Sequence, residues 1–209
     1  MIISFISKKT IIRESNMKVI GISGSPRKGG NTEILVRHTL EPFREAGWEV
    51  SEFFLSEKSI KPCVGCDSCR KTGSCKIKDD DMGYVYDEFS SCDAIVIGSP
   101  VYYRNVTAQL KALFDRCYVF SEKRPLDGKV GGAIAVGKGE GAGQSIVLNI
   151  IYNFYLSCGA ICVPGILNGL SARADKCGDI LDQEKRLQQA RFLGENILKY
   201  ATLIKGYHG

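Results

Sequence analysis

The sequence predicts an α/β fold, a doubly wound parallel sheet of five strands in a single domain. Three observations lead to this prediction. Short apolar runs alternate with helical stretches along the chain after Met17. Two of these runs, 94–99 and 131–137, are almost entirely apolar, as in strands that helices cover on both faces. The length of 209 residues suits one large domain of this kind.

The expected elements follow one another without a linker or an internal repeat. The five expected strands are short apolar runs at residues 18–23, 49–55, 94–99, 131–137 and 160–163. Between them, helical stretches are expected at residues 32–46, 105–118 and 143–157. From about Asp179, apolar or small residues recur in steps of three and four, which indicates an amphipathic helix covering the sheet.

Pro42 lies inside the first expected helix. Proline lacks a backbone N–H, and its ring clashes with the preceding helical turn. We therefore expect a kink or an early end of this helix near Glu41.

The first 16 residues fit neither the alternating pattern nor a signal peptide, because Lys8 and Lys9 follow a very short apolar stretch instead of preceding it. We assign an extension of unknown role to residues 1–16 and one domain to residues 17–209.

The longest apolar runs are far shorter than the roughly 20 residues of a membrane helix. The formal net charge is +5, with acidic and basic residues interspersed. We therefore expect neither a membrane nor a nucleic-acid partner.

Three loops follow expected strands at the edge where an open α/β sheet binds its ligands. The first loop combines hydroxyls, an amide and a guanidinium with backbone N–H groups at the start of a helix, a combination that suits a phosphate monoester. The alternative is a glycine-rich turn whose serines only cap the helix. The candidate phosphate-binding residues are Ser23, Ser25, Arg27, Gly30, Asn31 and Thr32.

The second and third loops would hold a planar ring. Two tyrosines in the second loop provide flat apolar surface with polar tips, although an exposed aromatic loop or a dimer contact is the alternative. The glycines of the third loop let the backbone approach a ligand closely, or mark a flexible turn. The candidate ring-binding residues are Ser99, Pro100, Val101, Tyr102, Tyr103, Asn105, Gly137, Gly139 and Gly141. Together the three loops predict a mononucleotide with a flat head group.

Three motifs in these loops resemble the NAD(P)H-dependent FMN reductases of the flavodoxin-like group: Ser23-x-Ser25-Pro26-Arg27, Gly30-Asn31-Thr32 and Ser99-Pro100-Val101-Tyr102. The resemblance covers nearly everything after Met17. It implies a flavodoxin-like fold that binds FMN, with the phosphate on the first loop and the isoalloxazine ring between the second and third. The third loop of that family often reads Gly-Gly-Gln-Glu, whereas Ser145 follows Gly143-Gln144 here.

Nine cysteines are the unusual feature of the composition, and four of them lie within 13 residues, as Cys63-x2-Cys66-x2-Cys69-x5-Cys75. Structural zinc sites usually use two separated pairs. Three cysteines that are each separated by two residues can instead surround a group larger than a single ion, and iron–sulfur clusters are bound by such runs. We therefore predict a 4Fe–4S cluster on these four cysteines, with structural zinc or free redox thiols as alternatives.

The other five cysteines are scattered and mostly lie beside apolar residues: Cys92, Cys117, Cys158, Cys162 and Cys177. Free cysteine is among the most buried residue types. An odd number of cysteines without an export signal also argues against a disulfide framework. We expect these five to be packing thiols in a reducing cytoplasm.

The cysteine motif at about residues 61–82, after the second strand, resembles the iron–sulfur flavoprotein family specifically. The resemblance implies a homo-oligomer, a dimer or a tetramer, fed by ferredoxin, in which the cluster of one subunit approaches the flavin of a neighbour. The carboxyl end of the second strand opens on the edge of the flavin loops, so we also expect cluster and FMN to share one rim of the sheet. Lys71, Lys76 and Lys78 flank the cysteines, either to steer an acidic ferredoxin or as a solvated loop face.

The sequence thus predicts an FMN-dependent oxidoreductase that passes single electrons from a ferredoxin-like donor through a 4Fe–4S cluster to FMN and on to an acceptor. One alternative is an NAD(P)H-dependent flavin or quinone reductase without a cluster. The other is a non-catalytic FMN- or partner-binding module with structural zinc. No catalytic side chain is nominated, and Asp79, Asp80 and Asp81 are expected to begin a helix, with a divalent-metal site as the alternative.

Overall fold

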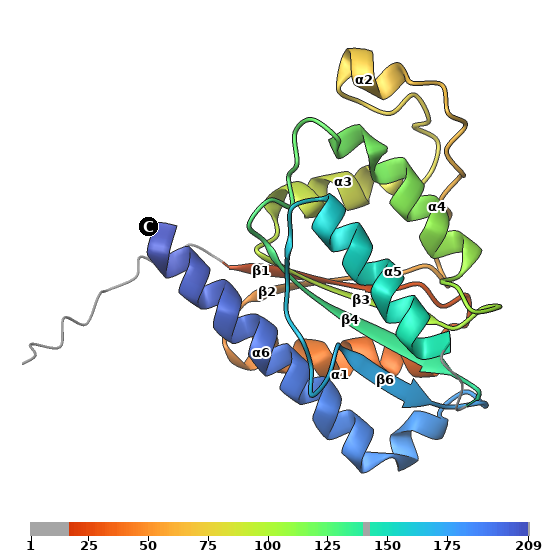
Figure 1. Cartoon of the computed structure of the whole chain (residues 1–209), viewed down its shortest axis with the longest axis vertical. Coiled ribbons are helices and arrows are strands. Elements are labelled where there is room, and N and C mark those ends of the chain that lie inside the picture. The colour runs from red at the N-terminus through yellow and green to blue at the C-terminus, as the bar shows by residue number, and fades with distance from the viewer. Residues whose placement is uncertain (1–16, 140–142, 209) are drawn as a thin grey trace, which may run out of the picture.

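The computed structural model describes residues 17–139 and 143–208. A parallel sheet lies between two layers of helices (Figure 1). Five of its strands take the order β2-β1-β3-β4-β5. They are β1 (Lys18–Ser23), β2 (Glu49–Phe54), β3 (Ala94–Pro100), β4 (Val130–Gly137) and β5 (Ile161–Cys162). This is the flavodoxin-like order, so the predicted fold class is confirmed.

The fifth position of the sheet is shared by two short strands. β5 pairs with the first residues of β4, and β6 (Leu170–Arg173) pairs with its last four residues, both in parallel. The sequence analysis expected a strand at residues 160–163 and missed β6. In β6 the side chains of Leu170 and Ala172 are buried and those of Ser171 and Arg173 are exposed. β6 ends at the same edge as β4, where the predicted ligand loops lie (Figure 1).

Helices α1 (Asn31–Glu45) and α6 (Glu184–His208) cover one face of the sheet (Figure 1). Their apolar side chains form a buried cluster with β1, β3 and β4. Helix α1 continues through Pro42 to Glu45, so the predicted early end near Glu41 is wrong. Pro42 lies in the last turn, where the helix loses one backbone hydrogen bond and Ala46 still donates to the Pro42 carbonyl at 3.0 Å.

The opposite face carries α3 (Met82–Ser91), α4 (Ala108–Arg116), the 3-10 helix η1 (Cys117–Phe120) and α5 (Gly143–Ser157). Tyr155 of α5 is fully buried, and its hydroxyl donates to the Gly132 carbonyl at 3.1 Å. A Cβ at Gly131 would lie 2.8 Å from the Tyr155 ring, so glycine lets α5 approach β4. The remaining elements are the short helix α2 (Ser68–Thr72) and the 3-10 helix η2 (Asp179–Asp182). Within the described residues, no helix is both long and apolar enough to span a membrane.

Candidate functional site

One pocket at the carboxyl ends of β1, β3 and β4 is lined by parts of all three predicted loops. One lining residue, Val136, is in β4, and nine come from these loops: Ser25, Arg27, Gly30, Asn31, Thr32, Pro100, Val101, Tyr102 and Lys138. Ser23 and Ser99 are fully buried behind this surface. Gly141 lies outside the described residues. The fold thus gathers segments more than 100 residues apart in the sequence around one hollow.

The first loop turns around the hydroxyl of Ser25, which is 4% exposed. The N–H of Arg27 donates to Ser25 Oγ at 3.1 Å, and the N–H of Ser25 donates to Ser23 Oγ at 3.4 Å. Gly29 has a φ of +63°, a left-handed conformation that favours glycine. Helix α1 begins directly after this turn, so its free N–H groups face the pocket and provide a site for an anion.

Thr107, which the sequence analysis did not nominate, ties the first loop to the second. Its hydroxyl donates to the Gly24 carbonyl at 2.6 Å and accepts the N–H of Leu110 at 3.2 Å, as the N-cap of α4. Its own N–H donates to Ser99 Oγ at 3.3 Å. A threonine just before a helix was a readable capping signal, but its contact with Gly24 depends on the fold.

The second loop ends in a tight turn. Tyr102 and Asn105 exchange two backbone hydrogen bonds, at 2.9 and 3.0 Å. The two residues between them, Tyr103 and Arg104, have φ values of +48° and +62°. Such conformations are strained for residues other than glycine and cluster at functional sites. Tyr103 is fully exposed at the tip, while Tyr102 lines the pocket.

The third loop is packed against Gln144 of α5. The side-chain amide of Gln144 donates to the Gly139 carbonyl at 2.8 Å. A Cβ at Gly137 would lie 2.6 Å from the same amide nitrogen, and one at Gly143 would lie 2.8 Å from Val101. Glycines at these two positions therefore let the start of α5 close against the second and third loops.

A fourth segment, which the sequence analysis missed, completes the pocket. Ala174, Asp175 and Cys177 follow β6 and line the hollow beside the first loop. We call residues 174–179 the strap. The local sequence signal for this segment is the alternation of apolar and polar residues in Leu170–Arg173, and four residues are too few to distinguish a strand from a turn.

The four clustered cysteines line a second pocket, together with Asp115 and Arg116 at the end of α4 and Tyr118 of η1. Cys63 and Cys66 are exposed, and Cys69 and Cys75 are half-buried. Left-handed φ values at Gly65, Asp67 and Gly73 bend the chain repeatedly around this pocket. In the part of the chain that the structure describes, no three His, Cys, Asp or Glu side chains are arranged around a single metal ion.

The two pockets lie near opposite ends of α4. The N-cap Thr107 contacts the first and second loops, whereas Arg116, the last residue of α4, lines the cysteine pocket. A nine-residue helix is about 13 Å long. The cysteine pocket therefore does not lie at the rim of the sheet where the first pocket lies, and the expectation that the two sites share this rim is wrong. The cysteine loop leaves the sheet edge after β2 but passes beyond the layer of α3 and α4 (Figure 1).

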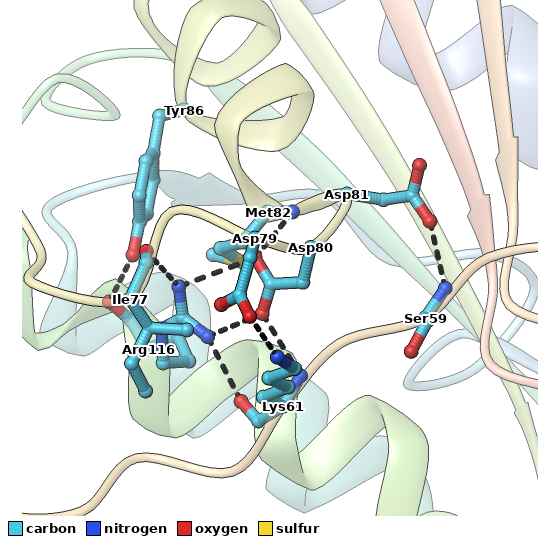
Figure 2. Close-up of polar contacts among 9 residues, drawn as sticks. All are labelled: Ser59, Lys61, Ile77, Asp79, Asp80, Asp81, Met82, Tyr86 and Arg116. Carbon is cyan, nitrogen blue, oxygen red and sulfur yellow. Dashed lines mark hydrogen bonds and ion pairs between the residues drawn. The ribbon is translucent and has the colours of Figure 1, made fainter.

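A buried ion pair closes the base of the cysteine loop (Figure 2). Arg116 Nη1 donates to Asp80 Oδ2 at 2.6 Å, and both side chains are 1% exposed. The same guanidinium donates to the carbonyls of Lys61 and Ile77, at 2.9 and 3.0 Å. Lys61 precedes the cysteines and Ile77 follows them, so the pair fixes both ends of the loop. We call this arrangement the clasp.

Asp80 of the clasp and its neighbour Asp81 lie at the start of α3, as the sequence predicts. The N–H of Met82, the first residue of α3, donates to Asp80 Oδ1 at 3.2 Å, and the N–H of Ser59 donates to Asp81 Oδ2 at 2.8 Å (Figure 2). Burial alone would raise the pKa of Asp80, but the hydrogen bonds from Arg116, Lys61 and Met82 hold it below its usual value. Both members of the pair are therefore charged at neutral pH.

The scattered cysteines occupy different environments. Burial raises the pKa of Cys92 to about 12 and also raises the pKa of Cys117 well above its ordinary value. Both are packing thiols, as expected. Cys158 and Cys162 are half-buried, and burial also raises their pKa values. Cys177 is exposed and lines the first pocket, so the expectation of a buried thiol is wrong there.

The chain is similar to known proteins in sequence and in fold. The family described as NADPH-dependent FMN reductase matches residues 17–172. An iron–sulfur flavoprotein of Methanocaldococcus jannaschii is 40% identical over 193 residues, which are 90% of this chain and 100% of the relative. The chain belongs to the FMN reductase family and, within it, to the iron–sulfur flavoproteins.

Solved structures place this iron–sulfur flavoprotein in the same fold as two other proteins. The structure of RosB with bound 8-demethyl-8-formylriboflavin-5'-phosphate has a TM-score of 0.71 at 16% identity, covering 91% of this chain and 81% of that one. A flavodoxin from the domain Archaea has a TM-score of 0.59 at 17% identity, covering 89% and 99%. At these identities the likeness concerns the fold alone. Family membership makes this iron–sulfur flavoprotein an FMN-dependent oxidoreductase.

Proposed function

We propose that this protein passes single electrons from a ferredoxin-like donor through a 4Fe–4S cluster to FMN, which then reduces an acceptor. The cluster would be held by Cys63, Cys66, Cys69 and Cys75. The observation that carries the proposal is that these four thiols line one pocket on a loop whose two ends the clasp fixes.

The first pocket fits FMN in its chemistry. Backbone N–H groups at the start of α1, the Ser25 and Thr32 hydroxyls and the Arg27 guanidinium suit a phosphate monoester. Pro100, Val101 and Tyr102 offer apolar and aromatic surface for the isoalloxazine ring.

The donor set of the second pocket fits an iron–sulfur cluster, which takes four thiolates. When bound, the cluster supplies one-electron transfer and FMN takes up one or two electrons. The chain's own task is to position these groups and to exclude competing ligands. Arg116 and Asp80 hold the loop for this purpose, and Thr107 holds the flavin loops at the other end of α4.

The length of α4 between the two pockets supports a homo-oligomer, a dimer or a tetramer. Within one chain the helix keeps the cysteine pocket away from the flavin pocket, so contact between subunits would provide the shorter path. Lys71, Lys76 and Lys78 are exposed on the cysteine loop and would attract an acidic donor such as a ferredoxin in the cytoplasm.

Anoxic purification tests the cluster. The protein should be brown and contain about four irons and four sulfides per chain. Replacing Cys69 by Ala should remove most of the iron and keep bound FMN, because the two pockets are separate. Replacing Cys162 by Ala, a half-buried cysteine on β5, is the matched control and should change neither. One zinc ion per chain, or wild-type protein without iron, would rule the cluster out.

The description of the family favours one rival, direct hydride transfer from NADPH to the flavin. The iron-free Cys69→Ala variant separates the two functions. If electrons pass through the cluster, this variant should lose reduction of its FMN by ferredoxin. NADPH oxidation by the variant at the wild-type rate, with no ferredoxin-dependent activity in the wild type, would establish the hydride reductase instead.

A further inference from the structure

The strap, residues 174–179, lies against the first loop and is tied to it mainly by Asn31. The side-chain amide of Asn31 donates to the Lys176 carbonyl at 2.7 Å. Its oxygen accepts the N–H of Ile180 at 3.2 Å. Asn31 is the first residue of α1 and is 9% exposed. One buried side chain therefore joins the helix start, where a phosphate would sit, to the segment that follows β6.

Two further contacts join the strap to the first loop. Arg27 Nη1 donates to the Asp175 carbonyl at 3.4 Å. The Cys177 thiol donates to the Gly29 carbonyl at 3.0 Å. Three consecutive strap residues thus meet three residues of the first loop, which gives the pocket a wall at its phosphate end.

Two N–H groups of the strap are already engaged by a side chain of the strap itself. Those of Asp175 and Lys176 donate to the Asp179 carboxylate, at 3.0 and 2.7 Å. These hydrogen bonds lower the pKa of Asp179, which is therefore charged. The carboxylate of Asp175 pairs with the Lys138 ammonium at 3.0 Å, so this ion pair is part of the wall. The strap therefore closes the phosphate end of the pocket with backbone and an ion pair, and the N–H groups of Asp175 and Lys176 are not available to a second phosphate.

We infer that the strap makes this pocket selective for a flavin that ends in one phosphate, and that Asn31 and Asp179 position the strap for this role. FMN ends at its phosphate, whereas FAD continues through a second phosphate to adenosine and would meet the strap. The inference rests on the proposed binding of FMN in this pocket. It assigns to Asn31 a positioning role in addition to any contact of its backbone N–H with the phosphate.

The test compares dissociation constants for FMN, FAD and riboflavin, measured by flavin fluorescence on the full chain after removal of bound flavin. The wild type should prefer FMN to FAD. Asn31→Ala and Asp179→Ala each remove two hydrogen bonds that hold the strap, and each should lower this preference about tenfold. Riboflavin affinity should not change, because riboflavin lacks the phosphate and contacts only the ring-binding loops.

Asn196→Ala is the matched control. It removes a similar amide-to-carbonyl hydrogen bond, to Pro164 at 3.2 Å, outside the pocket, and should leave all three affinities unchanged. The two strap variants remove different hydrogen bonds, those of Asn31 on α1 and those of Asp179 within the strap, so the test survives the misfolding of either one.

Two results would overturn the inference alone: an unchanged ratio of FMN to FAD affinity in both strap variants, or equal weakening of all three flavins. A wild type that binds no flavin would overturn the proposed function as well.

Discussion

Asp80 and Arg116 bring two opposite charges into the interior at the base of the cysteine loop. Removing charges from water is costly, and the attraction between them offsets this cost only with good geometry and further hydrogen bonds. Here Asp80 also accepts backbone N–H groups of Lys61 and Met82, and Arg116 donates to two loop carbonyls. The clasp therefore fixes the geometry of the loop, whatever its net contribution to stability.

Replacing Arg116 by Met should destabilise the protein by about 3–5 kcal/mol, because the Asp80 charge remains buried without its partner. Iron content should fall with stability, since both ends of the cysteine loop lose a donor. Urea unfolding followed by circular dichroism, together with an iron assay, measures both effects. Lys111→Ala, which removes an exposed ion pair with Asp115, should cost at most about 1 kcal/mol. Equal losses in the two variants would contradict a structural role for the clasp.

The depressed pKa of Asp80 predicts a dependence of stability on pH. A carboxyl group whose folded pKa is below its unfolded value of about 3.9 stabilises the protein above that pH. The contribution is lost as the pH falls through the folded pKa. In chelator-treated protein, the difference in unfolding free energy between wild type and Asp80→Asn should be constant above about pH 5 and shrink below about pH 4. A constant difference down to pH 2 would show that Asp80 titrates normally.

At the scale of elements, the pairing of α1 with α6 depends on one glycine. A Cβ at Gly194 of α6 would lie 2.1 Å from the Thr39 carbonyl oxygen of α1, which is too close for any side chain. The backbones of the two helices therefore approach each other at this point. Helix α1 also carries Thr32 and Asn31 at its start, so its position on the sheet sets the position of the first loop.

Gly194→Ala should destabilise the protein by about 1–3 kcal/mol, because the two helices must separate to admit a methyl group. Gly206, on the same helix, has open space at its Cβ position. Gly206→Ala should be neutral or stabilise by up to about 1 kcal/mol, since alanine favours helix. Thermal melts of the two variants compare them directly. A stable Gly194→Ala variant would mean that α1 and α6 adjust freely.

At the scale of the whole molecule, α4 separates two sites that different parts of the fold hold in place. The first pocket, which we propose binds FMN, lies at the edge of the buried sheet, where glycines and Thr107 fix the loops. The cysteine pocket is built on a projecting loop that the clasp holds at its base (Figure 1). Loss of the second site should therefore leave the first intact, whereas loss of the sheet removes both.

Mixed oligomers test the proposal that the chain assembles and that sites of different subunits cooperate. By this proposal Cys69→Ala should lack the cluster, and Ser25→Glu should exclude FMN because it places a carboxylate at the proposed phosphate site. Co-expression of the two variants should restore part of the ferredoxin-dependent activity that each lacks alone. Variants that assemble but remain inactive together would mean that electrons pass within one subunit.

The sequence by itself determined the class of fold, three of the four segments around the first pocket and the four clustered cysteines. Each of these has a local signature. Strands covered on both faces are continuous apolar runs, loops at a helix start are rich in glycine and hydroxyl groups, and ligating cysteines keep a short spacing. Such patterns can be recognised in the sequence because residues close together in the chain lie in the same strand, loop or ligand site.

Only the tertiary structure decided the role of the strap, the clasp and the separation of the two pockets along α4. Arg116 contacts Asp80 across 36 positions of sequence, and Asn31 contacts Lys176 across 145. No local period or motif marks such partners, because an arginine, an asparagine or an aspartate is equally at home on a solvated surface. The packing of the sheet and helices decides which distant segment lies beside each of these residues, and this contact gives the residue its role.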